Sequence, residues 1–182
     1  GPRTLSNHEY FTRLGRRIIQ MINEHTADGY VFRVDMRLRP YGDSGPLVVS
    51  FAALEEYLVQ QGRAWERYAW IKARVISPQN CAQTTELMNL SRPFIFRKYL
   101  DFGAIDSMRK LHAQIRQEVR RKDRLDNIKL GPGGIREIEF IAQVFQLIRG
   151  GQDTQLHIRP TQKVLKIIAE SGKISRTITI KL

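Results

Sequence analysis

The sequence predicts an α+β fold that is predominantly helical, with a small piece of sheet near the front and a helical bundle behind it. Three observations lead to this prediction. An apolar stripe of helical period runs through residues 6–25, a strictly alternating segment follows at 30–39, and most later segments have helical spacing. At 182 residues the chain is long enough for one good core or two small lobes.

The first 50 residues hold the predicted sheet. The helix at 6–25 has one broad apolar stripe, made by Phe11, Leu14, Ile18, Met21 and Ile22. Asp28-Gly29 ends it, and a strand is expected at 30–39. Turn formers fill 40–46 (PYGDSGP), and an apolar run at 47–49 completes a predicted hairpin.

The residues after Ser50 are predicted to be helical. Ser50 is a good N-cap for a helix at 51–61, which Gly62 interrupts and which resumes through residue 76. The remaining predicted segments are a connector with a short helix at 80–91, helices at 103–122, 135–150 and 160–171, and a glycine-rich loop within 127–134. The predicted regions are therefore 1–50 (helix plus hairpin), 51–175 (helical bundle with loop 131–134) and a tail at 176–182.

Charge and cysteine content limit the class of protein. Thirty Lys and Arg face 18 Asp and Glu, and the net charge of +12 favours partners that carry phosphate or other negative charge. No apolar run is long enough for a transmembrane helix, and no signal peptide is visible. Cys81 is the only cysteine, which rules out an internal disulfide and favours a reducing, cytoplasmic compartment. The chain ends are interpreted as those of a fragment, with RTITIKL at the C-terminus unlike the rest.

The predicted strand FRVDMRLRP has one apolar and one charged face. Alternation places Arg33, Asp35, Arg37 and Arg39 on the same side. A carboxylate flanked by guanidinium groups suits metal-dependent phosphoryl transfer, because Mg²⁺ prefers oxygen ligands and guanidinium groups bind phosphate. A cross-strand ladder of salt bridges explains the same pattern, and these residues alone favour the ladder.

The stretch NIKLGPGGIREIEF is a second candidate. Gly131, Gly133 and Gly134 lead into a helix, where free backbone N–H groups would form an anion site, although a plain turn and helix start explains the glycines too. Within the helix a polar stripe is expected, made by Arg136, Glu139, Gln143 and Gln146. Glu137 falls instead on the apolar side with Ile141, Val144 and Ile148, where it needs a role in the site or an arginine partner.

A third candidate is RAWERYAWIKAR, residues 63–74. Arg63, Arg67, Trp70 and Arg74 share one helical stripe, and arginine with tryptophan suits nucleotide phosphates and bases. A solvated basic face is the simpler explanation. The opposite stripe, Trp65, Ala69, Ala73 and Ile76, is expected to face the core.

Three long blocks resemble one family. They are VFRVDMRLRPYGDSGPLVVSFAALEEYLVQQGRAWERYAWIKARVI, RPFIFRKYLDF and NIKLGPGGIREIEFIAQVFQLIRGG. Together they resemble the bacterial glutamine synthetase adenylyltransferase family, whose members both adenylylate and remove the adenylyl group. The last block is most similar to the N-terminal, adenylyl-removing half. The resemblance implies a partial nucleotidyltransferase sheet followed by a helical bundle.

The resemblance also implies a chemistry and a set of roles. Asp35 would be one of three carboxylates that bind two Mg²⁺ ions, whereas the Gly-Ser…Asp-x-Asp motif that supplies the other two is absent from this sequence. Catalytic roles fall to Asp35, Arg37, Arg39 and Glu137, and nucleotide or phosphate binding to Arg33, Arg67, Arg74, Gly133, Gly134, Arg136 and Glu139. The implied reaction is phosphorolysis of adenylyl-tyrosine to ADP.

The implied partners are adenylylated glutamine synthetase, the PII signal protein, glutamine as effector, nucleotide and inorganic phosphate, with no membrane or nucleic acid. The fragment alone is expected to be inactive and to bind no Mg²⁺ tightly. Two alternatives stay open: the adenylylating half of the same enzyme, and a non-catalytic basic module that binds nucleic acid or an acidic protein.

Overall fold

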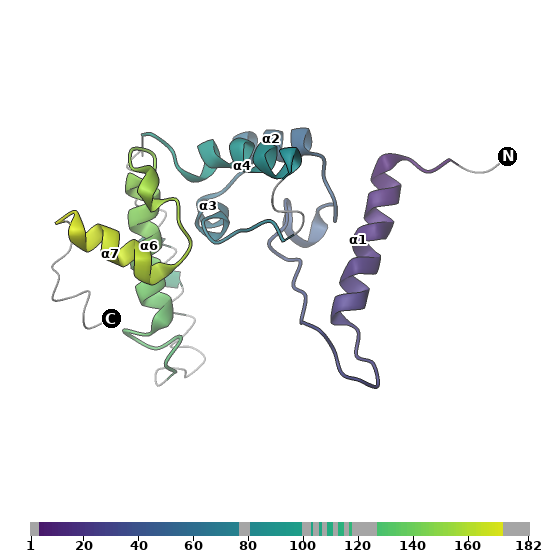
Figure 1. Ribbon diagram of the computed structural model, residues 1–182, viewed down its shortest axis with the longest axis horizontal. Coiled ribbons are helices and arrows are strands. Elements are labelled where there is room, and N and C mark those ends of the chain that lie inside the picture. Colours follow the sequence, from purple (N-terminus) through teal and green to yellow (C-terminus); the bar gives the residue numbers. More distant parts are fainter. Residues whose placement is uncertain are drawn as a thin grey trace. The chain divides into compact units, whose positions relative to one another are not determined.

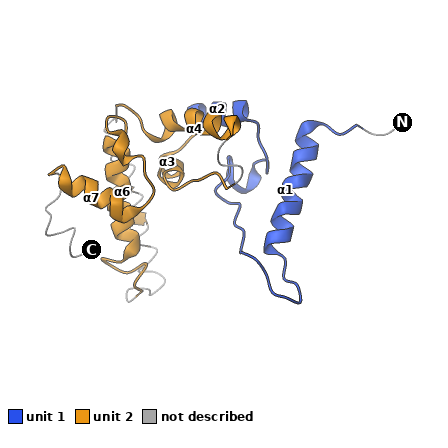
Figure 2. Ribbon diagram, viewed as in Figure 1, with its two compact units in different colours: residues 1–61 blue, residues 62–182 orange. Residues whose placement is uncertain are grey.

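The computed structural model describes residues 4–76, 81–99 and 127–172, with single positions between 103 and 117. The described elements are α1 (Asn7–Asn23), η1 (Gly42–Ser44), α2 (Phe51–Gln60), α3 (Ala64–Trp70), α4 (Ala82–Ile95), α6 (Ile135–Arg149), η2 (Thr154–Leu156) and α7 (Thr161–Glu170) (Figure 1). They belong to two compact units, residues 1–61 and 62–182 (Figure 2). The predominantly helical fold predicted from the sequence is confirmed. None of the described helices is long and apolar enough to cross a membrane.

The first unit begins with the predicted amphipathic helix, α1. Ser6 caps it by accepting the Glu9 N–H at 3.2 Å, while the Glu9 carboxylate accepts the Ser6 N–H at 2.9 Å. This reciprocal capping box satisfies two N–H groups that a helix start otherwise leaves unpaired. No residue of α1 is buried, although its apolar stripe is continuous.

The predicted hairpin is wrong in the described residues. Residues 32–36 have no regular secondary structure and pair with no strand, and only an isolated bridge, Thr26–Gly29, has sheet-like bonding in the part of the chain that is described. The Phe32 N–H donates to the Ile22 carbonyl and the Val34 N–H to the Asn23 side chain. A strand needs a ladder partner, and here the backbone groups bond to the end of α1 instead. A nucleotidyltransferase sheet is therefore not shown.

The middle of the chain is more interrupted than its spacing predicts. Ser50 caps α2 as expected, accepting the Ala53 N–H at 3.2 Å. The helix predicted to continue through residue 76 ends at Trp70. Conversely, the region 80–91 was predicted to be a connector with only a short helix. In the structure most of it belongs to α4, a helix that includes Pro93 in its last turn. Most of the predicted helix 103–122 and the tail 176–182 lie outside the described residues.

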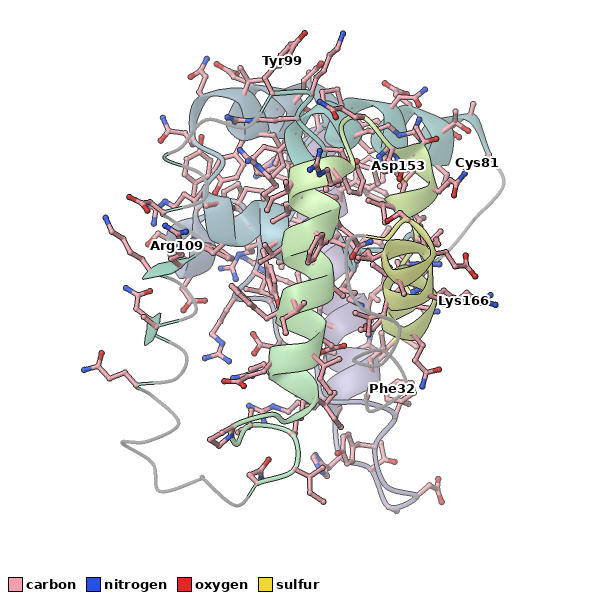
Figure 3. All side chains as sticks on the ribbon, turned by 90° about the vertical axis from the view of Figure 1, so that its left-hand side faces the viewer. Phe32, Cys81, Tyr99, Arg109, Asp153 and Lys166 are labelled. Atoms are coloured by element: carbon pink, nitrogen blue, oxygen red, sulfur yellow. The ribbon has the colours of Figure 1, made fainter. Side chains whose placement is uncertain are left out.

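The second unit has its core between α6 and α7, both of which match their predicted positions. Ala142 of α6 packs with Leu156 and with Val164, Leu165 and Ile168 of α7. Lys166 lies on the opposite, exposed side of α7 (Figure 3). The two faces of α7 therefore follow the amphipathic pattern of its sequence.

The buried face of α6 differs from the predicted one. Gln143 and Gln146, placed on a polar stripe from the sequence, are 3% and 0% exposed, while Ile141 is 43% exposed. The Gln143 amide donates to the Tyr68 carbonyl, and Gln146 donates to the carbonyls of Leu156 and Ile158 at 2.7 Å each. These bonds to backbone oxygens offset the cost of burying the amide N–H groups, whereas Gln146 Oε1 is buried without a hydrogen-bond partner among the described residues.

Candidate functional site

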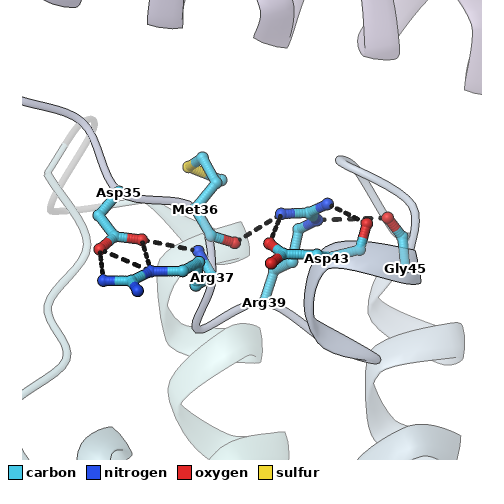
Figure 4. A network of polar contacts seen from close by, with 6 residues as sticks. All are labelled: Asp35, Met36, Arg37, Arg39, Asp43 and Gly45. Atoms are coloured by element: carbon cyan, nitrogen blue, oxygen red, sulfur yellow. Dashed lines mark hydrogen bonds and ion pairs between the residues drawn. The ribbon is translucent and has the colours of Figure 1, made fainter.

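Asp35 and Arg37 form a compact ion pair in the first unit (Figure 4). Arg37 Nη2 lies 2.6 Å from Asp35 Oδ2, Nε lies 3.1 Å from both carboxylate oxygens, and the Arg37 N–H donates to Oδ1 at 3.0 Å. These bonds hold the pKa of the Asp35 carboxyl at about 2, with a smaller contribution from Arg33. Both side chains are exposed, so the pair adds little stability of its own.

Arg39 has a different environment from Arg37. Its guanidinium group donates to the carbonyls of Met36 at 2.7 Å, Asp43 at 2.9 Å and Gly45 at 3.2 Å (Figure 4). Only 19% of its side chain is exposed. Arg39 thus folds back over the loop 40–46 and shapes it, which leaves less of it available for the predicted phosphate contact.

The loop around Arg39 needs unusual backbone geometry. Tyr41 and Gly42 both have positive φ, 61° and 59°. A Cβ on Gly45 would fall against the Pro40 carbonyl oxygen, so only glycine fits there. The turn predicted from PYGDSGP is present, and Arg39 rather than a strand pair holds it together.

The glycine-rich loop before α6 does not offer the free N–H groups that the sequence suggested. The Gly133 N–H donates to Glu137 Oε2 at 2.9 Å, and the Gly134 N–H donates to the Gly131 carbonyl at 2.9 Å. The N–H groups of Ile135 and Arg136 also bond to loop carbonyls. Gly133 has a φ of +72°, so the glycines serve a tight turn, and the predicted anion site is already filled by the chain itself.

The carboxylates of α6 have separate roles. Glu137 is half-buried and accepts the Gly133 N–H, which relieves the burial cost expected on an apolar face. Glu139 lies 4.0 Å from Lys72 Nζ, and Lys72 in turn donates to the Arg159 carbonyl and to Thr161. Burial, aided by Glu139 and opposed by Arg136, raises the pKa of Tyr68 to about 12. Arg136 is itself exposed.

The arginine stripe of residues 63–74 is split by the structure. Arg67 is 6% exposed, and its guanidinium carbon lies 5.7 Å from the centre of the Phe94 ring. The prediction that Arg67 lies on a solvated or phosphate-facing surface is therefore wrong. Ile76, predicted to face the core, is 79% exposed. Because α3 ends at Trp70, helical spacing no longer relates the residues on either side of that point.

Trp70 and Arg74 instead line a cavity of about 380 Å³ in the second unit. Arg92 of α4 and Arg159, after η2, line the same cavity. We call this cavity the basic pocket. Sequence reasoning missed Arg92 and Arg159, since they lie far along the chain from Arg74 and belong to no shared period.

The described residues do not form a metal centre. They contain no group of three His, Cys, Asp or Glu side chains that could hold an ion. Both oxygens of Asp35 already accept from Arg37. The two-Mg²⁺ site implied by the resemblance thus does not fit these residues alone.

Comparison with known proteins gives a consistent match. The model of the glutamate-ammonia ligase adenylyltransferase family matches residues 1–89, and that of the GlnD PII-uridylyltransferase matches residues 109–179. A bifunctional glutamine synthetase adenylyltransferase/adenylyl-removing enzyme of Chromobacterium violaceum is 65% identical over 169 residues, which cover 93% of this chain and 18% of the relative.

Enzymes of the same name from two other bacteria agree. The one from Nitrosomonas eutropha is 61% identical over 91% of this chain and 18% of its own length, and the one from Ralstonia nicotianae is 55% identical over 100% and 21%. The chain spans about a fifth of the length of these curated relatives. It therefore belongs to the family of bifunctional glutamine synthetase adenylyltransferase/adenylyl-removing enzymes, as a fragment.

Proposed function

We propose that this chain is part of the domain that removes AMP from adenylylated glutamine synthetase by phosphorolysis. The observation that carries the proposal is the identity of 55–65% with bifunctional enzymes over nearly the whole chain. The choice of the removing half depends on the block NIKLGPGGIREIEFIAQVFQLIRGG, which resembles that half of the family. The same proposal includes four further partners of the complete enzyme: nucleotide, inorganic phosphate, the PII protein and glutamine.

Asp35 is the residue to which the proposal assigns the central role. Its exposed carboxylate is ionised near neutral pH, Arg37 lowers its pKa further by donating to it, and the nearby Arg33 adds positive charge. An ionised carboxylate next to guanidinium groups suits a site where phosphate groups are exchanged. Arg37 is the nearest group able to turn from Asp35 to a phosphate oxygen, whereas Arg39 holds the loop beside them.

The test uses the complete bifunctional enzyme with the substitution Asp35→Asn. Removing the charge while keeping the size should abolish phosphate-dependent release of ADP from adenylylated glutamine synthetase and leave adenylylation near its normal rate. Asp43→Asn is the matched control: it lies in the same segment, its side chain is 78% exposed, and its carboxylate lies 3.7 Å from Arg39. The control should keep both activities.

The same experiment separates the alternatives. Loss of adenylylation with deadenylylation retained would instead assign this chain to the adenylylating half. If both activities survive Asp35→Asn, Asp35 has no part in the chemistry and the proposed role is wrong.

A further inference from the structure

The basic pocket is built entirely within the second unit. Its floor is apolar and well packed, with Ile71 and Ile95 only 6% and 4% exposed. Its volume of about 380 Å³ lies in the range of roughly 300–1,000 Å³ that is typical of small-molecule sites. None of the residues assigned to chemistry above, Asp35, Arg37, Arg39 or Glu137, lines it.

Three arginines line the pocket. Arg74, Arg92 and Arg159 are exposed, and within the described residues none of their side chains forms a hydrogen bond or ion pair. No Asp or Glu side chain is among the lining residues, so the positive charge there is not balanced locally. Three arginines that line one cavity are well suited to a phosphate group, to which each guanidinium group can donate two hydrogen bonds.

Aromatic groups complete the lining. Trp70 lines the pocket, and His157 stacks on Phe96 with ring centres 3.8 Å apart and planes 11° from parallel. His157 Nε2 lies 2.6 Å from the Gly150 carbonyl, which fixes the orientation of the imidazole ring. The lining thus combines aromatic rings, a histidine held by stacking and a hydrogen bond, and three arginines.

We propose that the basic pocket is a binding site for a phosphate-bearing small molecule. A nucleotide and free inorganic phosphate are two sources of the same group. The arginines bind the phosphate, and the indole of Trp70 contacts the ring of a nucleotide where one is present. This site goes beyond the proposed function, since it contains none of the residues assigned to catalysis; Arg74 alone in its lining is among the phosphate-binding residues that the family resemblance implies.

Isothermal titration calorimetry of the 182-residue chain with ADP, AMP, inorganic phosphate and adenosine, without divalent cations, tests the proposal. ADP should bind, and the double variant Arg92→Gln/Arg159→Gln should weaken binding by about tenfold or more. Arg149→Gln is the matched control, because Arg149 is an exposed arginine of the same unit that does not line the pocket. It should change affinity by less than about twofold.

Fluorescence places the ligand in the pocket. The chain has two tryptophans, Trp65 and Trp70, and only Trp70 lines the pocket. ADP should change the emission of the native chain, and Trp70→Phe should remove that change while Trp65 still emits. Arg92→Lys keeps the charge and the fold but loses the paired donors, so its affinity should fall between those of the native chain and the double variant.

Each outcome of these binding experiments either supports or overturns the proposed site. Equal binding of inorganic phosphate and ADP supports the site with free phosphate as its ligand, and tighter binding of ADP supports a nucleotide. Adenosine binding as tightly as ADP would overturn the proposal, and so would a failure of all phosphate-bearing probes to bind. An equal loss in Arg149→Gln would show attraction to the overall charge of +12 rather than a built site.

Discussion

Asp35 and Arg37 show how far alternation can predict a residue's surroundings. The sequence placed them on one face of a strand, and the structure does bring them together, although Asp35 lies in irregular backbone and Arg37 in a turn. The same rule placed Arg39 beside them, but its guanidinium group turns to three carbonyls of the following loop. Alternation predicts on which side of the backbone a side chain starts. It does not predict which groups the end of a long side chain contacts.

The low pKa of Asp35 depends on Arg37 and can be tested directly. Arg37→Gln should raise the pKa of Asp35 from about 2 toward its ordinary value of 3.8, as followed by carbon NMR of the carboxyl group. Arg33→Gln is the matched control and should have a smaller effect, because Arg33 makes the smallest contribution among the causes. An unchanged pKa in Arg37→Gln would show that the pair does not form in solution.

The pair also sets a pH dependence with a defined sign. The pKa of Asp35 in the folded chain lies below 3.8, so the pair stabilises the fold above that pH. The stabilisation is lost as the pH falls through about 2. Because both side chains are exposed, its size is small.

At the scale of elements, helices were predictable where a helical apolar period is bounded by glycine or proline. Residues 135–150 and 160–171 were expected to be helical, and α6 and α7 fall within one residue of those limits. The face of α6 was not predictable, since two glutamines, usually surface residues, are buried by bonds to backbone carbonyls of another segment. Periodicity predicts a buried face from the polarity of the side chains alone. It cannot show that backbone carbonyls from another segment will lie close enough to accept from a buried glutamine.

Replacing Gln146 tests whether these buried hydrogen bonds stabilise the fold. It donates from one amide nitrogen to the carbonyls of Leu156 and Ile158, and it is 0% exposed. Gln146→Leu should lower the free energy of unfolding by about 2 kcal/mol or more, since two carbonyls lose their donor. Urea unfolding followed by circular dichroism measures this loss.

Gln162→Leu is the matched control for that experiment. Gln162 is an exposed residue of α7, so its replacement should change the free energy of unfolding by less than about 0.5 kcal/mol. Equal stability of Gln146→Leu and the native chain would contradict the buried role of the amide.

At the scale of the whole molecule, α1 of the first unit and the core helices of the second unit differ in how much of their apolar surface is buried. The second unit has a core of fully buried side chains, including Val164 and Ile168 at 0% and 1% exposure. In the first unit no residue of α1 is buried, and Phe11, Leu14, Ile18 and Met21 are between 42% and 64% exposed. The sequence predicted the apolar stripe of α1 correctly, but a stripe does not reveal whether anything covers it.

This difference predicts unequal local stability in the 182-residue chain. Helices that bury little apolar surface open at low cost, so backbone amides of α1 should exchange with deuterium much faster than those of α6. Hydrogen exchange with mass spectrometry measures both helices in one sample. Equal protection of α1 and α6 would show that the apolar stripe is covered in solution, for example by self-association, and repeating the experiment at lower protein concentration would expose that case.

The way in which Arg39 holds the loop determines how many loop residues can be substituted without changing its conformation. Arg39 binds backbone carbonyls, which every amino acid supplies, so most loop side chains are not needed for the loop's shape. Three positions are strictly tied to it: Arg39, which supplies the donors, Gly42, whose φ of 59° favours glycine, and Gly45, where any larger residue would collide with Pro40. Mutational tolerance should therefore be high at Asp43 and low at these three, so three positions encode the conformation of the loop next to Asp35.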